Sequence, residues 1–365
     1  MTVEFVNLKS SYDLYAEEYE RAAIRCLRSG WYILGNELSE FEKRFADFIG
    51  SKYCIGVGNG QEALILAFRA LGIGVGDEVI TQSNAYIASV LGITENGATP
   101  VFVEPNGYFT IDADKIEAAI TSKTKAILAV HLYGQASDME RISAIAKAHG
   151  LYLIEDCAQC HGAQQNGRMM GTFGDISCFS FYPTKPIGAL GDAGACVTNS
   201  AELENRLKML RNYGSGKKYV NEILGTNSRM DELQAAMLQV SLDHTYDGIK
   251  RRGEIAARYL SGIDNPLVTL PKAAPNMNHV WHIFALMTVK RDELQNHLLL
   301  CGIKTAVHYP IPPHLQQCYA YLGHKAGDFP IAERYANEEL SLPIYNGMTD
   351  EDVDSVINAV NCFEG

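Results

Sequence analysis

Basic residues are scarce in this sequence. Its 31 Lys and Arg residues stand against 43 Asp and Glu residues, and the formal net charge is −12. A surface that binds nucleic acid or an anionic membrane is expected to be rich in Lys and Arg, so both classes of function are disfavoured. A substrate that carries a nucleotide remains compatible with this charge, because a few basic side chains and backbone N–H groups suffice to bind a phosphate.

Long hydrophobic runs and a disulfide framework are also missing. No stretch approaches the roughly 20 apolar residues that a membrane-spanning helix needs, and residues 1–7 show neither the basic nor the apolar part of a secretory signal. The nine cysteines are an odd number scattered from Cys26 to Cys362, which is typical of reduced thiols. We therefore expect a cytoplasmic enzyme, and 365 residues suit two domains or one large and one small domain.

Short apolar runs alternate with helical stretches between about residues 50 and 200. The runs predict strands at residues 53–58, 78–81, 99–103, 125–130, 151–154, 176–180 and 195–198. Helical stretches at 62–71 and 139–149 lie between them. Continuous apolar runs are typical of strands buried on both faces, so we expect a largely parallel α/β sheet. Ligands of such sheets bind beyond the carboxyl ends of the strands.

A second, smaller domain is predicted after residue 244. A long helical stretch at about 229–260 leads out of the sheet, and the remainder mixes helices with strand-like pieces such as residues 280–287. We assign residues 1–244 to a large domain and residues 245–365 to a smaller α/β domain.

Lys185 has the most unusual surroundings of any charged residue in the sequence. It stands in the segment 179–192, among aromatic residues, two prolines and a glycine-rich run, between two predicted buried strands. A dry, rigid turn can lower the pKa of an amine and make it a nucleophile or a base. The segment therefore predicts a catalytic lysine.

Two glycine-rich clusters indicate which kind of ligand the protein could bind. The cluster at residues 56–61 has Gln61 where a dinucleotide-binding G-x-G-x-x-G motif needs its third glycine, and the cluster at 72–77 fails in the same way. The first cluster does follow a strand and open a helix, so the backbone N–H groups of Gly60, Gln61 and Glu62 predict a phosphate site. A plain tight turn is an equally good interpretation of this segment alone.

Asp156 stands at the carboxyl end of a predicted strand, where a buried carboxylate could hold a protonated ring nitrogen. We expect Glu155 beside it to be a solvated loop acid. Residues 157–161 match the C-x-x-C-H motif of c-type haem attachment, but that chemistry belongs to exported proteins and no second cysteine pair has zinc-site spacing. We expect Cys157 and Cys160 to be inert thiols in or near the core.

A buried lysine, a partner for a protonated ring nitrogen and a phosphate site together describe pyridoxal phosphate. Four blocks carry a resemblance to a known family: residues 29–35, 155–163, 179–192 and 225–236. The sequence resembles the DegT/DnrJ/EryC1/StrS sugar aminotransferases over nearly its whole length. The resemblance implies the α/β fold of fold type I pyridoxal-phosphate-dependent transferases (aspartate aminotransferase-like), with a large, mostly parallel sheet domain and a smaller C-terminal α/β domain.

The resemblance also implies a set of cofactor contacts: Gly60, Gln61, Tyr86, Asp156, Gln159, Ser180, Lys185 and Asn227. Lys185 would be the catalytic residue and bind the cofactor covalently. Asp156 would hold the pyridine nitrogen and Gln159 would lie beside the 3-oxygen of the ring. Asn227 would reach the phosphate from the partner subunit of an obligatory homodimer.

The other implied contacts surround the phosphate and the ring face. Ser180 and the amides of Gly60 and Gln61 would bind the phosphate, and Tyr86 would stack on the ring. The family often has Gly-Thr where this sequence has Gly60-Gln61, so a side-chain hydroxyl contact to the phosphate is not expected here.

The activity implied is transfer of an amino group from L-glutamate to a nucleotide-linked keto-sugar. Several blocks look most like the branch that converts dTDP-3-keto-6-deoxyhexoses to 3-amino-3,6-dideoxy sugars. In that branch Tyr182, Lys218, His308 and Tyr309 would line the sugar or its pyrophosphate. For His308 and Tyr309 a packed turn is an equal alternative, and Lys218 with its neighbour Lys217 could be a solvated charge pair.

Three other functions are compatible with the same fold. The first is amination at C4 of a GDP- or UDP-linked 4-keto sugar, as in perosamine-type synthases. The second is a sugar dehydratase, which carries histidine where Lys185 stands and is therefore disfavoured. The third is a non-catalytic regulator or scaffold that keeps the fold without the chemistry.

Overall fold

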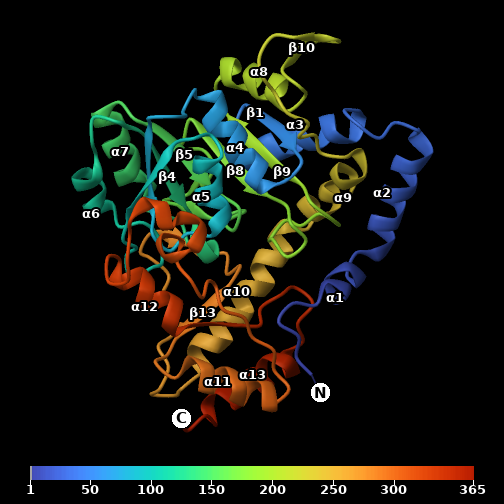
Figure 1. Cartoon of the computed structure of the whole chain (residues 1–365). Helices are drawn as coiled ribbons and strands as arrows, with labels where there is room; N and C mark the ends of the chain where they lie inside the picture. The colour runs from blue at the N-terminus through green and yellow to red at the C-terminus, as the bar shows by residue number, and fades with distance from the viewer. Residues whose placement is uncertain (1) are drawn as a thin grey trace.

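The computed structural model describes residues 2–365, so Met1, the first residue of the predicted large domain, lies outside the described chain. A seven-stranded sheet has the order β1-β9-β8-β5-β4-β2-β3 (Figure 1). Its strands are β1 (Tyr53–Val57), β2 (Glu78–Gln82), β3 (Thr99–Val103), β4 (Thr124–Val130), β5 (Tyr152–Asp156), β8 (Ile176–Ser180) and β9 (Gly194–Thr198). Strand β9 runs opposite to the other six strands, which are parallel to one another, and this confirms the predicted largely parallel sheet.

Helices cover both faces of this sheet. One face packs against α3 (Asn36–Ile49), α7 (Met139–His149) and α9 (Glu232–Asp243), and the other against α4 (Gly60–Ala70), α5 (Ile87–Thr94) and α8 (Ala201–Leu210). Successive strand residues point to opposite faces, so Ile127 joins the first core and Leu128 joins the second. Burial on both faces explains why the strands read as continuous apolar runs.

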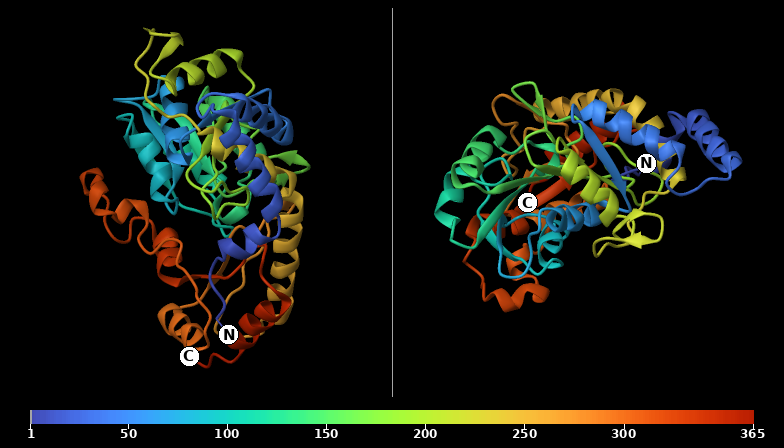
Figure 2. Two further views of the ribbon diagram at one scale, coloured as in Figure 1. Left: turned by 90° about the vertical axis from the view of Figure 1, so that its right-hand side faces the viewer. Right: turned by 90° about the horizontal axis from the view of Figure 1, so that it is seen from above.

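The C-terminal part has a core of its own. It contains α10 (Thr245–Gly262), β13 (Phe284–Met287), α11 (Arg291–Leu300), α12 (Pro330–Glu338), β14 (Glu339–Leu342) and α13 (Asp350–Asn361). Strands β13 and β14 pair antiparallel, and Val3 joins their apolar cluster through a parallel bridge to Ile303. Figure 2 shows α10 running from the sheet into this part, where both chain termini lie.

The remaining elements are short or lie at the periphery. They are α1 (Leu8–Asp13), α2 (Ala16–Ser29), α6 (Ala113–Ile116), β6 (Gln164–Gln165), β7 (Arg168–Met169), β10 (Ser215–Lys217), β11 (Val220–Asn221), β12 (Met277–Asn278) and 3-10 turns at Glu117–Ala119, Leu132–Gly134, Pro313–Leu315 and Gln317–Leu322. None of the helices formed by residues 2–365 has the length and apolarity to cross a membrane.

Two of the predicted elements differ in the structure. The single helix expected at 229–260 is broken at His244, whose ring stacks on Tyr15 with 3.5 Å between ring centroids and whose Nε2 lies 3.1 Å from Glu18. The strand expected at 280–287 begins only at Phe284. Trp281 has a positive φ of 51°, and Val280 N–H donates to Gly134 O instead of to a neighbouring strand.

Candidate active site

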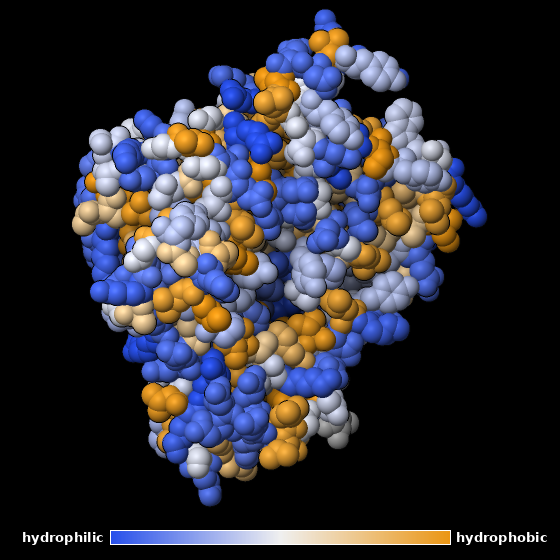
Figure 3. All heavy atoms as spheres, in the orientation of Figure 1, coloured by the Kyte–Doolittle hydropathy of each residue, from blue (hydrophilic) through white to orange (hydrophobic). Residues whose placement is uncertain are grey.

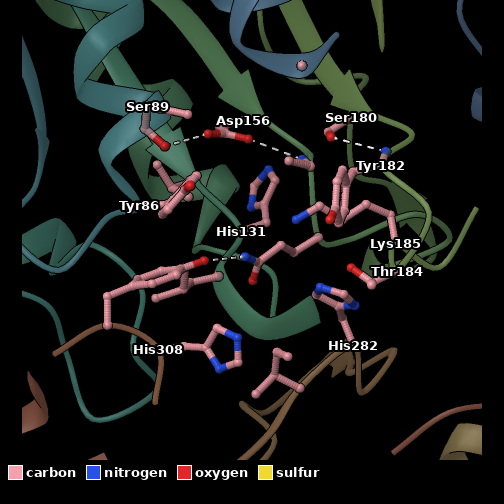
Figure 4. A pocket seen from close by; sticks show the side chains of 18 of the residues that line it. Tyr86, Ser89, His131, Asp156, Ser180, Tyr182, Thr184, Lys185, His282 and His308 are labelled. Carbon is pink, nitrogen blue, oxygen red and sulfur yellow. Dashed lines mark hydrogen bonds between the residues drawn. The ribbon is translucent and has the colours of Figure 1, made fainter. Parts of the chain in front are cut away.

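A cavity of about 610 Å³ lies at the carboxyl ends of the strands. Five residues that line it end a strand or come soon after one: Gly60, Tyr86, His131, Asp156 and Ser180. Parallel strands bring their carboxyl ends to one edge, which is why residues far apart in the sequence meet here. His282 and His308 of the C-terminal part lie on the other side of the cavity (Figure 4). The molecular surface is hollowed near the middle of the face drawn in Figure 3.

Lys185 lies in the loop between β8 and β9, and its side chain lines the cavity. Two backbone hydrogen bonds tie this loop together, from Lys185 N to Tyr182 O and from Ala189 N to Phe181 O, both at 2.8 Å. Burial lowers the pKa of the Lys185 amine to about 8, and the negative charge of Asp156 offsets part of that effect. About a tenth of this amine is therefore neutral, and nucleophilic, at pH 7, far more than for an ordinary lysine.

Asp156 is the last residue of β5 and is almost fully buried. Its Oδ2 accepts a hydrogen bond from Ser89 Oγ at 2.6 Å, and its Oδ1 accepts one from Ala158 N–H at 3.1 Å (Figure 4). A carboxylate has about four acceptor positions, so these bonds orient the group and leave capacity for a cation in the cavity.

The amide of Gln159 is oriented by two neighbours. Its Oε1 accepts the Tyr133 N–H at 2.6 Å, and its Nε2 donates to the Tyr309 hydroxyl at 3.1 Å. The amide group therefore presents N–H donors rather than its oxygen toward Tyr309 and the cavity wall. An N–H donor is the group needed beside a ring oxygen that carries negative charge.

The turn from β1 into α4 forms a cradle for an anion. The side chain of Asn59 caps α4 by accepting the Glu62 N–H at 2.9 Å. Within residues 2–365 no acceptor receives the N–H groups of Gly60 and Gln61, which lie in the first turn of the helix. A Cβ on residue 60 would lie 2.5 Å from Ser180 Cβ, so only glycine lets the turn approach the end of β8 this closely.

Aromatic side chains form another part of the wall. The rings of Tyr86 and Tyr309 lie 4.7 Å apart between centroids, and Tyr182 and His308 also line the cavity. Burial lowers the pKa of His308 to about 4, with a smaller effect of the nearby Lys185 charge, so this imidazole is neutral at neutral pH. Tyr182 is exposed, which leaves its ring accessible to a ligand.

The structure does not bring Lys218 and Asn227 into this cavity. Both are exposed, and they lie in and after the β10–β11 hairpin. The chain by itself therefore supplies ten of the twelve predicted site residues to one pocket.

The prediction for Glu155 was wrong. It lies within β5 and is completely buried, where its carboxylate accepts hydrogen bonds from the Gly171, Phe173 and Gly174 N–H groups, the Ser177 hydroxyl and His131 Nε2. These bonds keep its pKa below the ordinary value in spite of burial. A charged residue inside a strand looks solvated in a sequence because its partners come from distant segments.

Cys157 and Cys160 are buried, and their sulfur atoms lie near a ring nitrogen of His131. Burial raises the pKa of both thiols, which keeps them protonated. His131 Nδ1 accepts the Ser137 N–H at 3.0 Å and Nε2 bonds to Glu155, so both of its nitrogens are already engaged. The group consequently belongs to the packed core.

Two further residues of the cavity carry no signal in the sequence. Arg252 lines the cavity from α10, is almost fully buried, and burial alone lowers its pKa to about 10. It donates only to backbone carbonyls, the nearest being Ile344 O at 2.7 Å, and its Nε has no partner within residues 2–365. His282 is also buried, and burial with the charges of Lys185 and Arg252 lowers its pKa strongly.

The parallel sheet with helices on both faces, and the buried lysine and carboxylate at its carboxyl edge, define the class of fold type I pyridoxal-phosphate-dependent transferases. Within this class the chain belongs to the DegT/DnrJ/EryC1/StrS aminotransferase family, whose pattern matches residues 14–361. It is therefore an aminotransferase, as the resemblance implied.

Known relatives match almost the whole chain. A protein of Aneurinibacillus thermoaerophilus described as dTDP-3-amino-3,6-dideoxy-alpha-D-galactopyranose transaminase is 52% identical over 99% of both chains. The crystal structure of Streptomyces venezuelae DesV in complex with a ketimine intermediate has a TM-score of 0.97 at 47% identity, covering 99% of this chain and 98% of that one. A Bacillus subtilis NtdA structure with bound cofactor PMP has a TM-score of 0.89 at 32% identity, covering 94% and 81%.

Proposed function

We propose that this protein transfers the amino group of L-glutamate to dTDP-3-keto-6-deoxyhexose, giving dTDP-3-amino-3,6-dideoxyhexose, with pyridoxal phosphate as its cofactor. The observation that carries the proposal is the meeting of Lys185 and Asp156 on one cavity, with the Gly60–Gln61 N–H groups at its edge. The name of the Aneurinibacillus thermoaerophilus relative supports the dTDP-linked sugar and amination at C3.

The donor set fits the cofactor. Lys185 supplies an amine that is partly neutral, Asp156 a carboxylate oriented toward the cavity, and the start of α4 two N–H groups without acceptors within residues 2–365. Ser180, Gln159 and Tyr86 would complete the contacts to the phosphate, the ring oxygen and the ring face. When bound, pyridoxal phosphate supplies the carbonyl that takes up the amino group and a ring that withdraws electrons from the adjacent carbon.

The chain's own groups then move and hold protons. Lys185 Nζ removes the proton from the α-carbon of glutamate and later returns a proton on the same side, first as general base and then as general acid. Its pKa of about 8 suits both roles near neutral pH. The Asp156 carboxylate keeps the proton on the ring nitrogen by placing a negative charge beside it.

The amino donor needs a cation for its carboxylates, and Arg252 is suitably placed. It lines the same cavity as Lys185 and has no carboxylate partner within residues 2–365. A buried guanidinium without a counter-ion is unfavourable, and glutamate would supply one. We infer that Arg252 binds a carboxylate of the amino donor, whereas Tyr182, His308 and Tyr309 contact the sugar.

We propose that Asn227 and Lys218 act in the cavity of the partner subunit of a homodimer. Each chain would extend its β10–β11 hairpin toward the cavity of the other, so that Asn227 reaches the phosphate and Lys218 the sugar nucleotide. The exposed Tyr219, Val220 and Leu224 of this hairpin region are apolar surface that a partner subunit could cover.

The test is a mass-resolved product assay with L-glutamate and a panel of dTDP-, UDP- and GDP-linked 3-keto and 4-keto sugars. We expect amination of the dTDP-linked 3-keto-6-deoxyhexose, and turnover of only 4-keto sugars would reject the proposed regiochemistry. The enzyme with cofactor should also show a visible absorbance band that is lost in Lys185→Ala and kept in Lys147→Ala, an exposed lysine on α7. Absence of the band from the wild type would indicate a non-catalytic protein.

A further inference from the structure

A buried carboxyl group is connected to the cavity through two other side chains. Glu339 begins β14, and its Oε1 is hydrogen-bonded to Ser341 Oγ. Ser341 Oγ lies 2.8 Å from Nδ1 of His308, and the His308 backbone N–H donates to the other Glu339 oxygen, Oε2, at 2.7 Å. His308 lines the cavity (Figure 4). Glu339 and Ser341 are completely buried and are not among the residues that line it.

Few charges reach Glu339. Arg291 of α11 is the one cation that acts on it, and no cation of residues 2–365 lies within ion-pair distance. Burial raises the pKa of Tyr133 and Tyr309, and the charge of Glu339 adds a smaller effect, but the Tyr133 hydroxyl donates to His308 O and the Tyr309 hydroxyl accepts from Gln159 Nε2. Burial consequently raises the pKa of Glu339 to about 8, so this carboxyl group can hold a proton at neutral pH and release it slightly above.

On its cavity side, His308 faces the Lys185 and His282 side chains. The pKa of His308 is lowered to about 4, so the ring carries one proton and that proton occupies either Nδ1 or Nε2. Which nitrogen carries it depends on the hydrogen bond made at Nδ1.

Two proton arrangements satisfy every bond in this chain. The His308 backbone N–H can only donate, so it occupies Glu339 Oε2 in both arrangements and leaves Oε1 to Ser341. When Glu339 is ionised, Ser341 donates to Glu339 and His308 Nδ1–H donates to Ser341, which leaves Nε2 as an acceptor. When Glu339 is protonated, both bonds reverse and Nε2 carries the proton as a donor.

We propose that Glu339, Ser341 and His308 form a proton relay that delivers a proton from the buried carboxyl group to an oxygen of the substrate at His308 Nε2. His308 is then the residue that contacts the substrate, and Glu339 and Ser341 are positioning residues. This inference rests on the proposed function for the identity of the substrate, an oxygen-bearing keto-sugar, but the relay itself is a property of the chain.

The transfer is balanced and needs no further reactant. The Nε2–H bond breaks as the substrate oxygen takes its proton, Nδ1 takes the Ser341 hydroxyl proton, and Ser341 Oγ takes the Glu339 proton. Glu339 ends as a carboxylate, while His308 and Ser341 are unchanged in charge. Removal of a keto oxygen as water requires such an acid, and a hydrogen-bonded chain can supply the proton without opening the core to solvent.

The relay is tested first without substrate. The cofactor-loaded enzyme is labelled with ¹⁵N-histidine, the His308 signals are assigned by their loss in His308→Gln, and the tautomer is followed from about pH 6 to about pH 10. We expect the proton to move from Nε2 to Nδ1 as the pH rises through the Glu339 pKa. In Ser341→Ala and in Glu339→Gln this change should disappear, and Ser341→Thr, which keeps a hydroxyl, should retain it.

A wild-type tautomer that stays constant over this range, or a transition of equal size in Ser341→Ala, would overturn the relay whatever the substrate is.

The second experiment measures single-turnover rates of the two half-reactions. Ser341→Ala and Glu339→Gln should slow amination of the keto-sugar by about 10- to 100-fold and flatten its pH profile, with a much smaller effect on the glutamate half-reaction. Equal losses in both half-reactions would contradict the relay, and failure of every keto-sugar to react would reject the proposed function alone.

Discussion

At the scale of single residues, the orientation of Asp156 depends on uncharged neighbours. Ser89, in the first turn of α5, lies 67 positions before Asp156 and donates to it in a buried environment. A hydrogen bond to an ionised group contributes about 1.5–3 kcal/mol. We therefore expect Ser89, which is itself buried, to set the orientation in which the Asp156 carboxylate binds a cationic ring nitrogen.

We expect Ser89→Ala to weaken cofactor binding by about 10-fold, in line with one lost charge-assisted hydrogen bond. The measurement is a titration of the cofactor-free protein with pyridoxal phosphate, followed by absorbance. Ser143→Ala is the matched control, since Ser143 Oγ is buried without a hydrogen-bond partner within residues 2–365. Equal affinities for the two variants would show that Ser89 does not orient Asp156.

Arg252 provides a second residue-scale prediction. Arg252→Met should raise KM for glutamate by about 10- to 100-fold through loss of an ion pair with its carboxylate, and should affect the keto-sugar half-reaction much less. Arg251→Met is the control, because the neighbouring Arg251 is paired with Asp350 at the surface. A parallel loss in both half-reactions would indicate that Arg252 only binds the carbonyls of Trp281, His282 and Ile344.

Residues whose surroundings come from adjacent positions in the chain could be predicted from the sequence. Residues whose surroundings come from distant segments were missed. Lys185 is recognisable because its prolines, aromatics and glycines are its neighbours in the chain. Ser89, Arg252 and Glu339 look like ordinary helix or strand residues, and only the folded chain places Ser89 and Arg252 in the cavity wall and Glu339 behind it. Their roles depend on contacts between distant segments, which residue type and spacing do not record.

At the scale of elements, the strands were the most predictable part of the fold. Burial on both faces imposes continuous apolar runs, and each of the seven runs became a strand of the sheet. The helix break at His244 could not be predicted from the pattern of apolar residues, because the residues on both sides of it have helical patterns. It depends on packing against Tyr15, a contact with the N-terminal segment.

The start of α4 gives a prediction for an element. Gly60→Ala would place a Cβ 2.5 Å from Ser180 Cβ and 3.0 Å from its Cα, so the helix start or the end of β8 must shift. We expect this shift to weaken binding of pyridoxal phosphate by at least about 10-fold, because N–H donors act only at hydrogen-bond distance. Binding of pyridoxal without its phosphate should change little.

The matched control is Gly253→Ala on α10. A Cβ at residue 253 meets nothing within 4 Å, and alanine is the better helix former by roughly 0.5–1 kcal/mol. This variant should unfold at a slightly higher temperature and bind the cofactor normally. If Gly60→Ala bound pyridoxal phosphate as well as Gly253→Ala does, the α4 start would not be the phosphate site.

At the scale of the whole molecule, residues from two parts of the chain line the cavity. The sheet supplies Lys185 and Asp156, and the C-terminal part supplies His282, His308 and the relay behind His308. A shift of the C-terminal part relative to the sheet would change the distance between the cofactor side of the cavity and its substrate side. Arg252 belongs to the second set, because its hydrogen bonds go to the carbonyls of Trp281, His282 and Ile344 in the C-terminal part.

The placement of Asn227 outside its own chain's cavity leads to a prediction about assembly. Lys185→Ala and Asn227→Ala homodimers should each be nearly inactive, the first without its amine and the second without a phosphate contact from the partner. Mixing the two variants by unfolding and refolding should restore about a quarter of wild-type activity, because half of randomly paired dimers are mixed and each holds one intact site. Activity no greater than that of the separate variants would mean that Asn227 acts within its own chain or not at all, and a monomer in solution would exclude the shared site directly.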